Sequence, residues 1–203
     1  MADGKARVAV LVSGGGTNLQ AIIDAERSGV ITSGEVVAVI SSRPDAYAIT
    51  RANNAGIPAV AVSKKQCASQ AEFEEKILAV LEEYKIDLIV LAGFMSILSA
   101  DFTKRYPGRI INVHPSLIPS FCGEGFYGLR VHEAALAKGV KVTGATVHFV
   151  NEIPDGGEII MQKAVSVREG DTPEKLQKRV MRQAEWKILP AAVEKISKEI
   201  ISK

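Results

Sequence analysis

The chain has 203 residues, of which 47% are hydrophobic and 24% are charged. This balance is typical of a globular protein whose core needs no disulfide or metal to hold it together. The 25 basic and 23 acidic residues give a net charge of only +2. A dedicated nucleic-acid-binding protein would show a strong basic excess, so this near-balance argues against that class.

The sequence predicts a cytoplasmic protein without a membrane-spanning segment. The start, Met1 to Arg7, lacks the apolar run of a secretory signal, and apolar runs such as 88–92 are too short to cross a bilayer. The two cysteines, Cys67 and Cys122, form no CxxC motif, which argues against a zinc ribbon or a thioredoxin-type site. A reducing compartment is the simplest interpretation of these cysteines.

The first half of the sequence alternates short β-branched runs with helical patterns. Strands are expected at residues 7–13, 36–41, 59–62, 88–92 and 110–113, and helices at residues 17–28, at residues 47–54 and from residue 69 onward. Two helix starts carry the pattern of a capping box, Thr17 with Gln20 and Ser69 with Glu72. Because apolar strands alternate with helices, the pattern predicts a parallel sheet covered by helices on both faces.

The alternation of strands and helices does not continue through the second half of the sequence. Strands expected at residues 142–150 and 159–167 have no room for a crossover helix between them, so they should pair antiparallel. A closing helix is expected with Thr172 as its cap and Pro173 in its first turn, and Pro190 should kink or interrupt it. The predicted fold class is α/β, a Rossmann-like and mostly parallel sheet with an antiparallel C-terminal strand pair.

A run of glycines lies between the first strand and the first helix. Gly14, Gly15 and Gly16 let the backbone approach a ligand closely, and the helix start offers unpaired N–H groups to an anion. The dinucleotide fingerprint fails because Leu19 replaces its third glycine, and no Walker Gly-Lys-Ser/Thr follows. A lone monophosphate is therefore the favoured ligand, and a tight turn without any ligand is the alternative.

Asn112 and His114 carry the most informative chemical pattern. Side chains alternate along a strand, so both point to one face, and Pro115 ends the strand. An amide and an imidazole N–H that converge on one point make an oxyanion hole. Asp155, just before a Gly-Gly pair, is a candidate to orient the imidazole and favour its charged form. The alternatives are that His114 is a hydrogen-bonded core histidine and that Asp155 belongs to a simple turn.

The sequence shows no nucleophile motif such as GxSxG, which favours direct attack by the substrate's own amine on an acyl donor.

The other two histidines show weaker evidence of a functional role. His132 is expected on a surface helix, and His148 shares a strand face with Thr146, where it either supports the site or is simply buried. No histidine spacing matches a metal site, so no metal is expected.

Four segments together resemble a known family. They are VLVSGGGTNLQAII from residue 10, LIVLAGFMSILS from residue 88, INVHPSLIPSF from residue 111 and GATVHFVNEIPDGGEIIMQ from residue 144. In this order the chain is similar to the phosphoribosylglycinamide formyltransferases of the 10-formyltetrahydrofolate-dependent type. The resemblance implies that the chain transfers the formyl group of 10-formyltetrahydrofolate to the primary amine of glycinamide ribonucleotide in de novo purine synthesis.

The resemblance also implies roles for individual residues. His114 would be the protonated catalytic histidine, Asn112 would hold the formyl oxygen as it becomes anionic, and Asp155 would keep His114 charged and help relay the amine's proton through water. The substrate-binding residues would be Gly15, Gly16, Thr17 and Asn18 at the phosphate, Arg182 as its basic partner and Glu185 at the glycinamide end. The folate-binding residues would be Met95, Ser96, Ile97, Leu98, Asn112 and Gln70, with the backbone of 150–155 facing the pterin.

The chain departs from the family pattern at three places. Ser96 replaces a basic residue, and Gln70 stands near the position of an arginine that often contacts folate. The segment 121–128 is longer than the short turn of many relatives. Its Phe126 and Tyr127 either pack over the active site or fill a surface crevice, and the crevice is favoured. A cis bond before Pro119 is left open.

Two further readings stay open beside the transferase. One is a related enzyme: a formyltetrahydrofolate hydrolase would need an extra N-terminal domain, and a methionyl-tRNA formyltransferase would need a basic C-terminal domain. The other is a non-catalytic phosphate-binding module, which would not need the polar trio of Asn112, His114 and Asp155.

We expect one domain over 1–203, with a phosphate-binding half at 1–100 and a catalytic and folate-binding half at 101–203. The expected partners are small-molecule substrates and a second copy of the chain in a homodimer, without nucleic acid or membrane.

Overall fold

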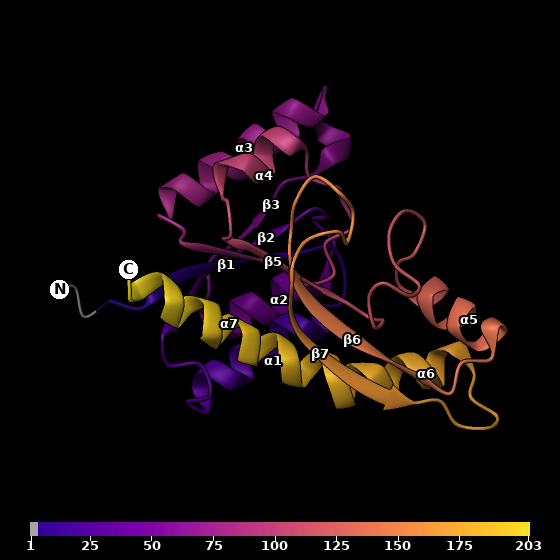
Figure 1. Ribbon diagram of the computed structural model, residues 1–203. Helices are drawn as coiled ribbons and strands as arrows, with labels where there is room; N and C mark the ends of the chain where they lie inside the picture. Colours follow the sequence, from indigo (N-terminus) through magenta and orange to yellow (C-terminus); the bar gives the residue numbers. More distant parts are fainter. Residues whose placement is uncertain (1–3) are drawn as a thin grey trace.

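The computed structural model describes residues 4–203, so the first three residues of the polar start lie outside the described part. A seven-stranded sheet with the order β3-β2-β1-β4-β5-β6-β7 forms its centre (Figure 1). The strands are β1 (Ala6–Val12), β2 (Gly34–Ser41), β3 (Ala59–Ala61), β4 (Leu88–Leu91), β5 (Ile110–His114), β6 (Val142–Phe149) and β7 (Ile159–Ser166). Pairing from β3 to β5 is parallel, whereas β5 with β6 and β6 with β7 are antiparallel. The predicted mixed sheet is therefore confirmed.

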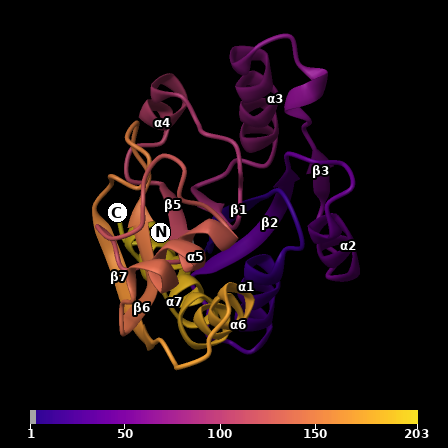
Figure 2. The same cartoon turned by 90° about the vertical axis from the view of Figure 1, so that its right-hand side faces the viewer.

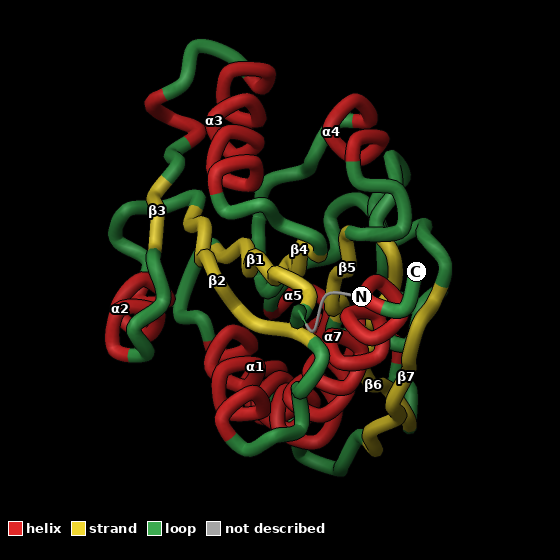
Figure 3. Tube along the Cα trace, turned by 90° about the vertical axis from the view of Figure 1, so that its left-hand side faces the viewer, coloured by secondary structure: helices red, strands yellow, loops and turns green. Residues whose placement is uncertain are grey.

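Helices cover the sheet on both faces, as the strand pattern predicts (Figures 1 and 3). The helices are α1 (Thr17–Arg27), α2 (Tyr47–Asn54), α3 (Gln70–Glu83), α4 (Ala100–Arg105), α5 (Leu129–Lys138), α6 (Pro173–Val180) and α7 (Trp186–Ile201). Residues of β1 alternate between two core layers: Val8 and Val10 belong to the layer that includes residues of α1, α6 and α7, while Ala9 and Leu11 belong to the layer that includes residues of α3 and α4. Both faces of β1 are thus buried, which explains its continuous apolar sequence.

The two edges of the sheet differ (Figure 2). Figure 2 shows α2, β3 and α3 at one edge and the β6–β7 pair at the other. A short 3₁₀ turn at Lys64–Gln66 links β3 to α3. The carboxyl ends of the central strands β1, β4 and β5 lie side by side between these edges, because the three strands are parallel neighbours.

Helix starts agree with the sequence at two places and differ at one. Ser69 Oγ accepts the Glu72 N–H at 3.1 Å, and Thr172 Oγ1 accepts the Lys175 N–H at 3.3 Å. The capping role of Thr17 is wrong, since Thr17 is the first helical residue and Gly16 is the cap, with no side-chain capping bond. Gly16 holds a left-handed conformation, with φ of 69°, that a glycine adopts without strain.

The closing helix runs through Pro190 rather than ending there. Its irregularity comes earlier, as a π-helical turn at Met181–Glu185 between α6 and α7. A proline leaves a carbonyl of the preceding turn without its usual donor, and a widened turn nearby is one way to accommodate this. The turn buries Ala184 and Glu185.

Gly16 offers a direct test of the turn after β1. A Cβ at this position would lie 2.7 Å from the Ala48 Cβ, and the positive φ adds strain. We expect Gly16→Ala to lower the free energy of unfolding by about 1–3 kcal/mol in urea denaturation. Gly14→Ala is the matched control, because a Cβ there meets nothing within 4 Å. Equal stability of the two variants would contradict this account.

Candidate active site

A cleft of about 840 Å³ opens at the carboxyl ends of β4 and β5. It is lined by Asn18, Gly93–Ile97, Asn112–Pro115, Gly123–Gly128, His132, Pro154, Asp155, Gln177, Met181 and Glu185. These residues come from both halves of the chain. The ends of parallel strands are where ligands bind in open α/β sheets, so the cleft lies where the fold predicts a site.

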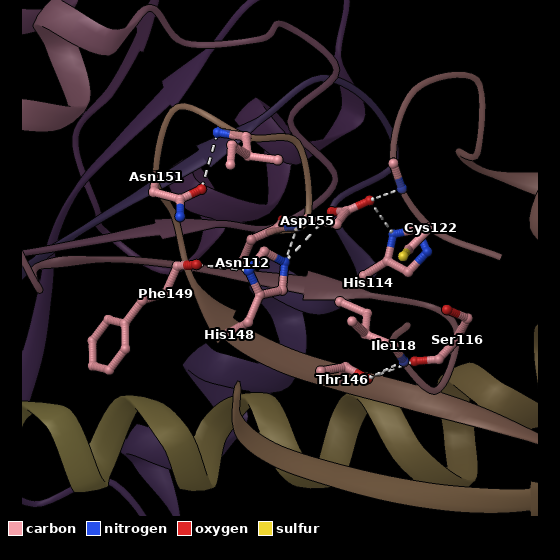
Figure 4. A network of polar contacts seen from close by, with 12 residues as sticks. Asn112, His114, Ser116, Ile118, Cys122, Thr146, His148, Phe149, Asn151 and Asp155 are labelled. Carbon is pink, nitrogen blue, oxygen red and sulfur yellow. Dashed lines mark hydrogen bonds and ion pairs between the residues drawn. The ribbon is translucent and has the colours of Figure 1, made fainter. Parts of the chain in front are cut away.

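The Asp155 carboxylate lies between two imidazoles (Figure 4). Its Oδ2 is 3.4 Å from His114 Nδ1, and its Oδ1 is 3.5 Å from His148 Nε2. The Gly123 N–H donates to the same Oδ2 at 2.9 Å. Asp155 therefore joins β5, β6 and the segment after β5, although these groups are far apart in sequence.

His148 orients Asn112 across the β5–β6 pair. The two residues are register partners, and Asn112 Nδ2 lies 3.2 Å from His148 Nε2. His148 Nδ1 lies 2.7 Å from the Phe149 carbonyl oxygen, which can only accept, so Nδ1 carries a hydrogen. In the neutral ring Nε2 then accepts from Asn112, and the second amide hydrogen of Asn112 is left for a ligand.

The charge state of His114 results from opposing effects. Burial lowers the pKa of His114, while the Asp155 charge and the bond to the Phe121 carbonyl raise it, and the net pKa lies below the ordinary value. The Phe121 oxygen is 2.8 Å from His114 Nε2. Both ring neighbours are acceptors that suit an imidazolium, yet burial outweighs them. Asp155 thus acts in the expected direction without making His114 readily charged.

The Asp155 carboxyl itself is stabilised as an anion. Burial raises its pKa, but the contact with His148, the charge of His114 and the Gly123 N–H together lower it below the usual value. A carboxylate that stays ionised can hold an imidazolium as soon as one forms.

His132 was expected at the surface, and this is wrong. The side chain is fully buried on the inner face of α5 and lines the cleft. Burial, with a smaller effect of His114, lowers the pKa of His132 to about 4, so the ring is neutral. Within the described residues neither ring nitrogen has a protein partner. The helical pattern could not show which element covers α5.

The turn after β1 is held by a residue that sequence analysis missed. Arg51 Nε donates to the Gly15 carbonyl at 2.8 Å, and Arg51 Nη1 donates to Gln20 Oε1 at 3.0 Å. This guanidinium places a positive charge beside the start of α1. Arg182 is exposed and is not part of the cleft lining.

Glu185 and Asn18 join the two ends of the chain inside the cleft. Asn18 Nδ2 donates to Glu185 Oε2 at 2.7 Å, across a separation of 167 residues. Burial raises the pKa of Glu185 to about 7, against a smaller lowering by Asn18. Asn18 Oδ1 is buried and has no partner within the described residues. Both side chains line the cleft and can meet a polar ligand there.

The loop after β4 forms the opposite wall. Met95, Ser96 and Ile97 line the cleft, and Leu98 lines an adjoining cavity of about 130 Å³ together with residues 150–155. Gln70 lies outside both linings, because its side-chain amide donates to the Ile97 carbonyl at 3.1 Å and to Glu74 at 2.6 Å. Gln70 therefore holds the wall in place.

The long segment after β5 also reaches the cleft. Phe126 and Tyr127 are part of its lining, against the favoured expectation that they fill a surface crevice. Phe126 packs edge-to-face on Phe121, with ring centroids 6.4 Å apart. The bond between Ile118 and Pro119 is cis.

Comparison with known proteins shows the family to which the chain belongs. The formyl transferase family matches residues 6–193. The chain belongs to the formyl transferase family. Enzymes of this family use 10-formyltetrahydrofolate as co-substrate, and this chain has no group of metal-ligating side chains among residues 4–203.

Individual relatives and solved structures of this family are similar to the chain over most of its length. The chain is 42% identical to the phosphoribosylglycinamide formyltransferase of Haemophilus influenzae over 92% of this chain and 85% of that protein. It is 47% identical to the human trifunctional purine biosynthetic protein adenosine-3 over 95% of this chain, but it spans only 18% of that protein's length. Glycinamide ribonucleotide transformylase 1 from Symbiobacterium toebii superposes with a TM-score of 0.90, at 42% identity, over 96% and 89% of the two chains. No helix within residues 4–203 is long and apolar enough to span a membrane.

The pKa of Glu185 predicts how stability changes with pH. A carboxyl whose pKa rises on folding from 4.5 to about 7 destabilises the folded state as pH increases through that range. We expect Glu185→Gln to match the unmodified chain in free energy of unfolding near pH 4 and to exceed it by about 2–3 kcal/mol at pH 8. Urea denaturation at several pH values measures this difference. A difference that stays constant with pH would argue against a buried carboxylate.

Proposed function

We propose that this chain transfers the formyl group of 10-formyltetrahydrofolate to the primary amine of glycinamide ribonucleotide, a step of purine biosynthesis. The observation that carries the proposal is the convergence of Asn112, His114 and Asp155 in one cleft with the start of α1 beside it. Relatives that this chain matches over most of their length bear the name of this activity. Direct transfer to the amine also agrees with the sequence, which shows no nucleophile motif for a covalent formyl-enzyme intermediate.

The cleft suits the ribonucleotide on one side. The N–H groups at the start of α1, at Gly15 to Asn18, would bind its phosphate, with the Arg51 guanidinium close by. Glu185 and the unpartnered Asn18 oxygen would bind the polar glycinamide end. Arg182 would reach the phosphate only from the exposed face of the π-helical turn.

The folate would occupy the other side. Met95 to Leu98 would line its pocket, and the backbone of 150–155 would face the pterin. Asn112 and Asp155 line both the cleft and the adjoining cavity. The formyl carbon would therefore sit where the two spaces meet, next to the polar trio.

The chemistry then follows from the groups present. The amine attacks the formyl carbon, and the carbonyl electron pair moves onto oxygen. The free Asn112 N–H donates to this oxyanion, and the positive charge of the His114 imidazolium, whose two N–H groups face the Phe121 carbonyl and Asp155, stabilises it through space. The carbon–N10 bond breaks, and the proton that the amine loses passes through water, relayed by Asp155, to N10 of the departing tetrahydrofolate. The developing negative charge offsets the cost of charging a buried His114.

A formyltetrahydrofolate hydrolase is the alternative reaction, with water in place of the amine. Tetrahydrofolate release measured with and without glycinamide ribonucleotide separates the two. We expect release only when both substrates are present. Release without the ribonucleotide would favour the hydrolase, and no release under any condition would favour a phosphate-binding module without catalysis.

We also infer a cytoplasmic homodimer without nucleic-acid or membrane partners. The near-neutral charge of +2 supports the absence of a nucleic-acid partner, and the free thiols of Cys67 and Cys122 support a reducing compartment. Light scattering of the purified chain tests the homodimer, and a monomer at micromolar concentration would contradict it.

The oxyanion role of Asn112 predicts a loss of rate. We expect Asn112→Ala to lower kcat by about 10²–10³-fold, because one donor to the oxyanion is removed, and His114→Ala to lower it at least as much. Steady-state kinetics gives the rates, and urea denaturation checks that both variants fold. Near-normal activity of Asn112→Ala would count against its role.

Asp155 is expected to set the pH dependence through His114. Its charge raises the pKa of His114 against the effect of burial, so Asp155→Asn should lower that pKa further. Because the mechanism requires protonated His114, we expect the alkaline limb of the pH–rate profile to move to lower pH and the rate near neutrality to fall. An unchanged profile would show that Asp155 acts only in the turn.

A further inference from the structure

The loop between β1 and α1 receives two hydrogen bonds from α2. The Ala48 N–H donates to the Gly14 carbonyl at 3.1 Å, and Arg51 Nε donates to the Gly15 carbonyl at 2.8 Å. The C=O and N–H of one trans peptide unit point in opposite directions. Because α2 holds these two carbonyl groups, the N–H groups of Gly15 and Gly16 point away from α2.

These two N–H groups are available to a ligand. Neither donates to a protein acceptor within residues 4–203. They lead into the first N–H groups of α1, which lack partners inside the helix. Asn18 beside them is only 9% exposed, and its Oδ1 has no partner in the described part of the chain. The loop therefore offers several donors to an anion and one buried acceptor to a hydroxyl group of the same ligand.

The Arg51 guanidinium is fixed on more than one side. Its Nη1 donates to Gln20 Oε1 at 3.0 Å, and its central carbon lies 5.1 Å from the centre of the Tyr47 ring. No carboxylate forms an ion pair with Arg51 among the described residues. A planar guanidinium donates to two acceptors in fixed directions, which a lysine ammonium does not. The contact with the Gly15 carbonyl is therefore held in a defined direction.

We propose that Arg51 is a positioning residue for the ribonucleotide phosphate. By holding the Gly15 carbonyl, Arg51 directs the Gly16 N–H of the same peptide unit toward the phosphate, and this N–H group rather than the guanidinium makes the contact. The inference rests on the proposed function, since it names the residue that prepares the anion site at the start of α1. Arg51 then contributes to the binding of a substrate that carries a phosphate and not to the formyl transfer itself.

The test compares glycinamide ribonucleotide with glycinamide riboside, which lacks the phosphate. We expect Arg51→Met to raise the KM for the ribonucleotide by roughly 10- to 100-fold, the range for a lost hydrogen bond to a charged group. The kcat and the KM for 10-formyltetrahydrofolate should stay within about twofold of the unmodified chain, since only uniform binding of the ribonucleotide is lost. The kcat/KM for the riboside should also be unchanged, whereas a general loss of structure would affect both acceptors equally.

Two further variants separate geometry from charge. Arg51→Lys keeps the positive charge but loses the planar fork, so we expect its KM for the ribonucleotide to rise by roughly 5-fold or more. Arg27→Met removes an exposed arginine from the end of α1 and should leave all these constants unchanged. Urea denaturation of each variant checks that the chain still folds.

A normal KM for the ribonucleotide in Arg51→Lys, or an equal loss with ribonucleotide and riboside in Arg51→Met, would overturn the positioning role. Titration with inorganic phosphate, followed by phosphorus NMR, gives a readout that needs no turnover. We expect weaker phosphate binding in both Arg51 variants, and unchanged binding would also overturn the role. If the unmodified chain formylates no ribonucleotide, the proposed function fails, while the phosphate titration still decides the role of Arg51.

Discussion

The Asp155 carboxylate, shared by His114, His148 and the Gly123 N–H, is the contact on which the site depends. It connects the end of β5, the antiparallel strand β6 and the long segment that lines the cleft. Removing this charge would take away the carboxylate that faces His114 Nδ1 and accepts the Gly123 N–H. The geometry of the proposed catalytic residues and the position of the segment at Gly123 therefore depend on the same ionised group.

Burial shifts the pKa values of a histidine and a glutamate in the cleft in opposite directions, and each shift favours the neutral form. It lowers the pKa of His114 and raises the pKa of Glu185 to about 7, so both groups tend toward their neutral forms before ligands bind. An oxyanion beside His114, or a cationic or hydrogen-bonding group beside Glu185, would shift that balance. The cleft is thus arranged so that charge becomes favourable when substrate supplies its complement.

Much of the fold could be predicted from local patterns. Apolar strands between helical segments predicted the parallel sheet, and the missing crossover helix before residue 159 predicted the antiparallel pair. The helix cap at Thr17 was wrong because Gly16 already provides the cap through its backbone. The surface position of His132 was also wrong, because the periodicity of a helix shows that it has an apolar face but not which part of its partner contains a cavity.

Spacing along one strand or one turn was enough to indicate an anion site and an amide–imidazole pair, whereas formyl transfer was implied by the resemblance of four segments to a known family. Contacts between distant segments depended on folding. The Asn18–Glu185 bond, the Arg51 contact with Gly15 and the Phe126 wall appear only once the chain is packed. The protonation states of the buried groups also depended on the tertiary structure. The free energy of a charge is set by the burial and the partners that surround it, and neighbours in sequence do not specify these.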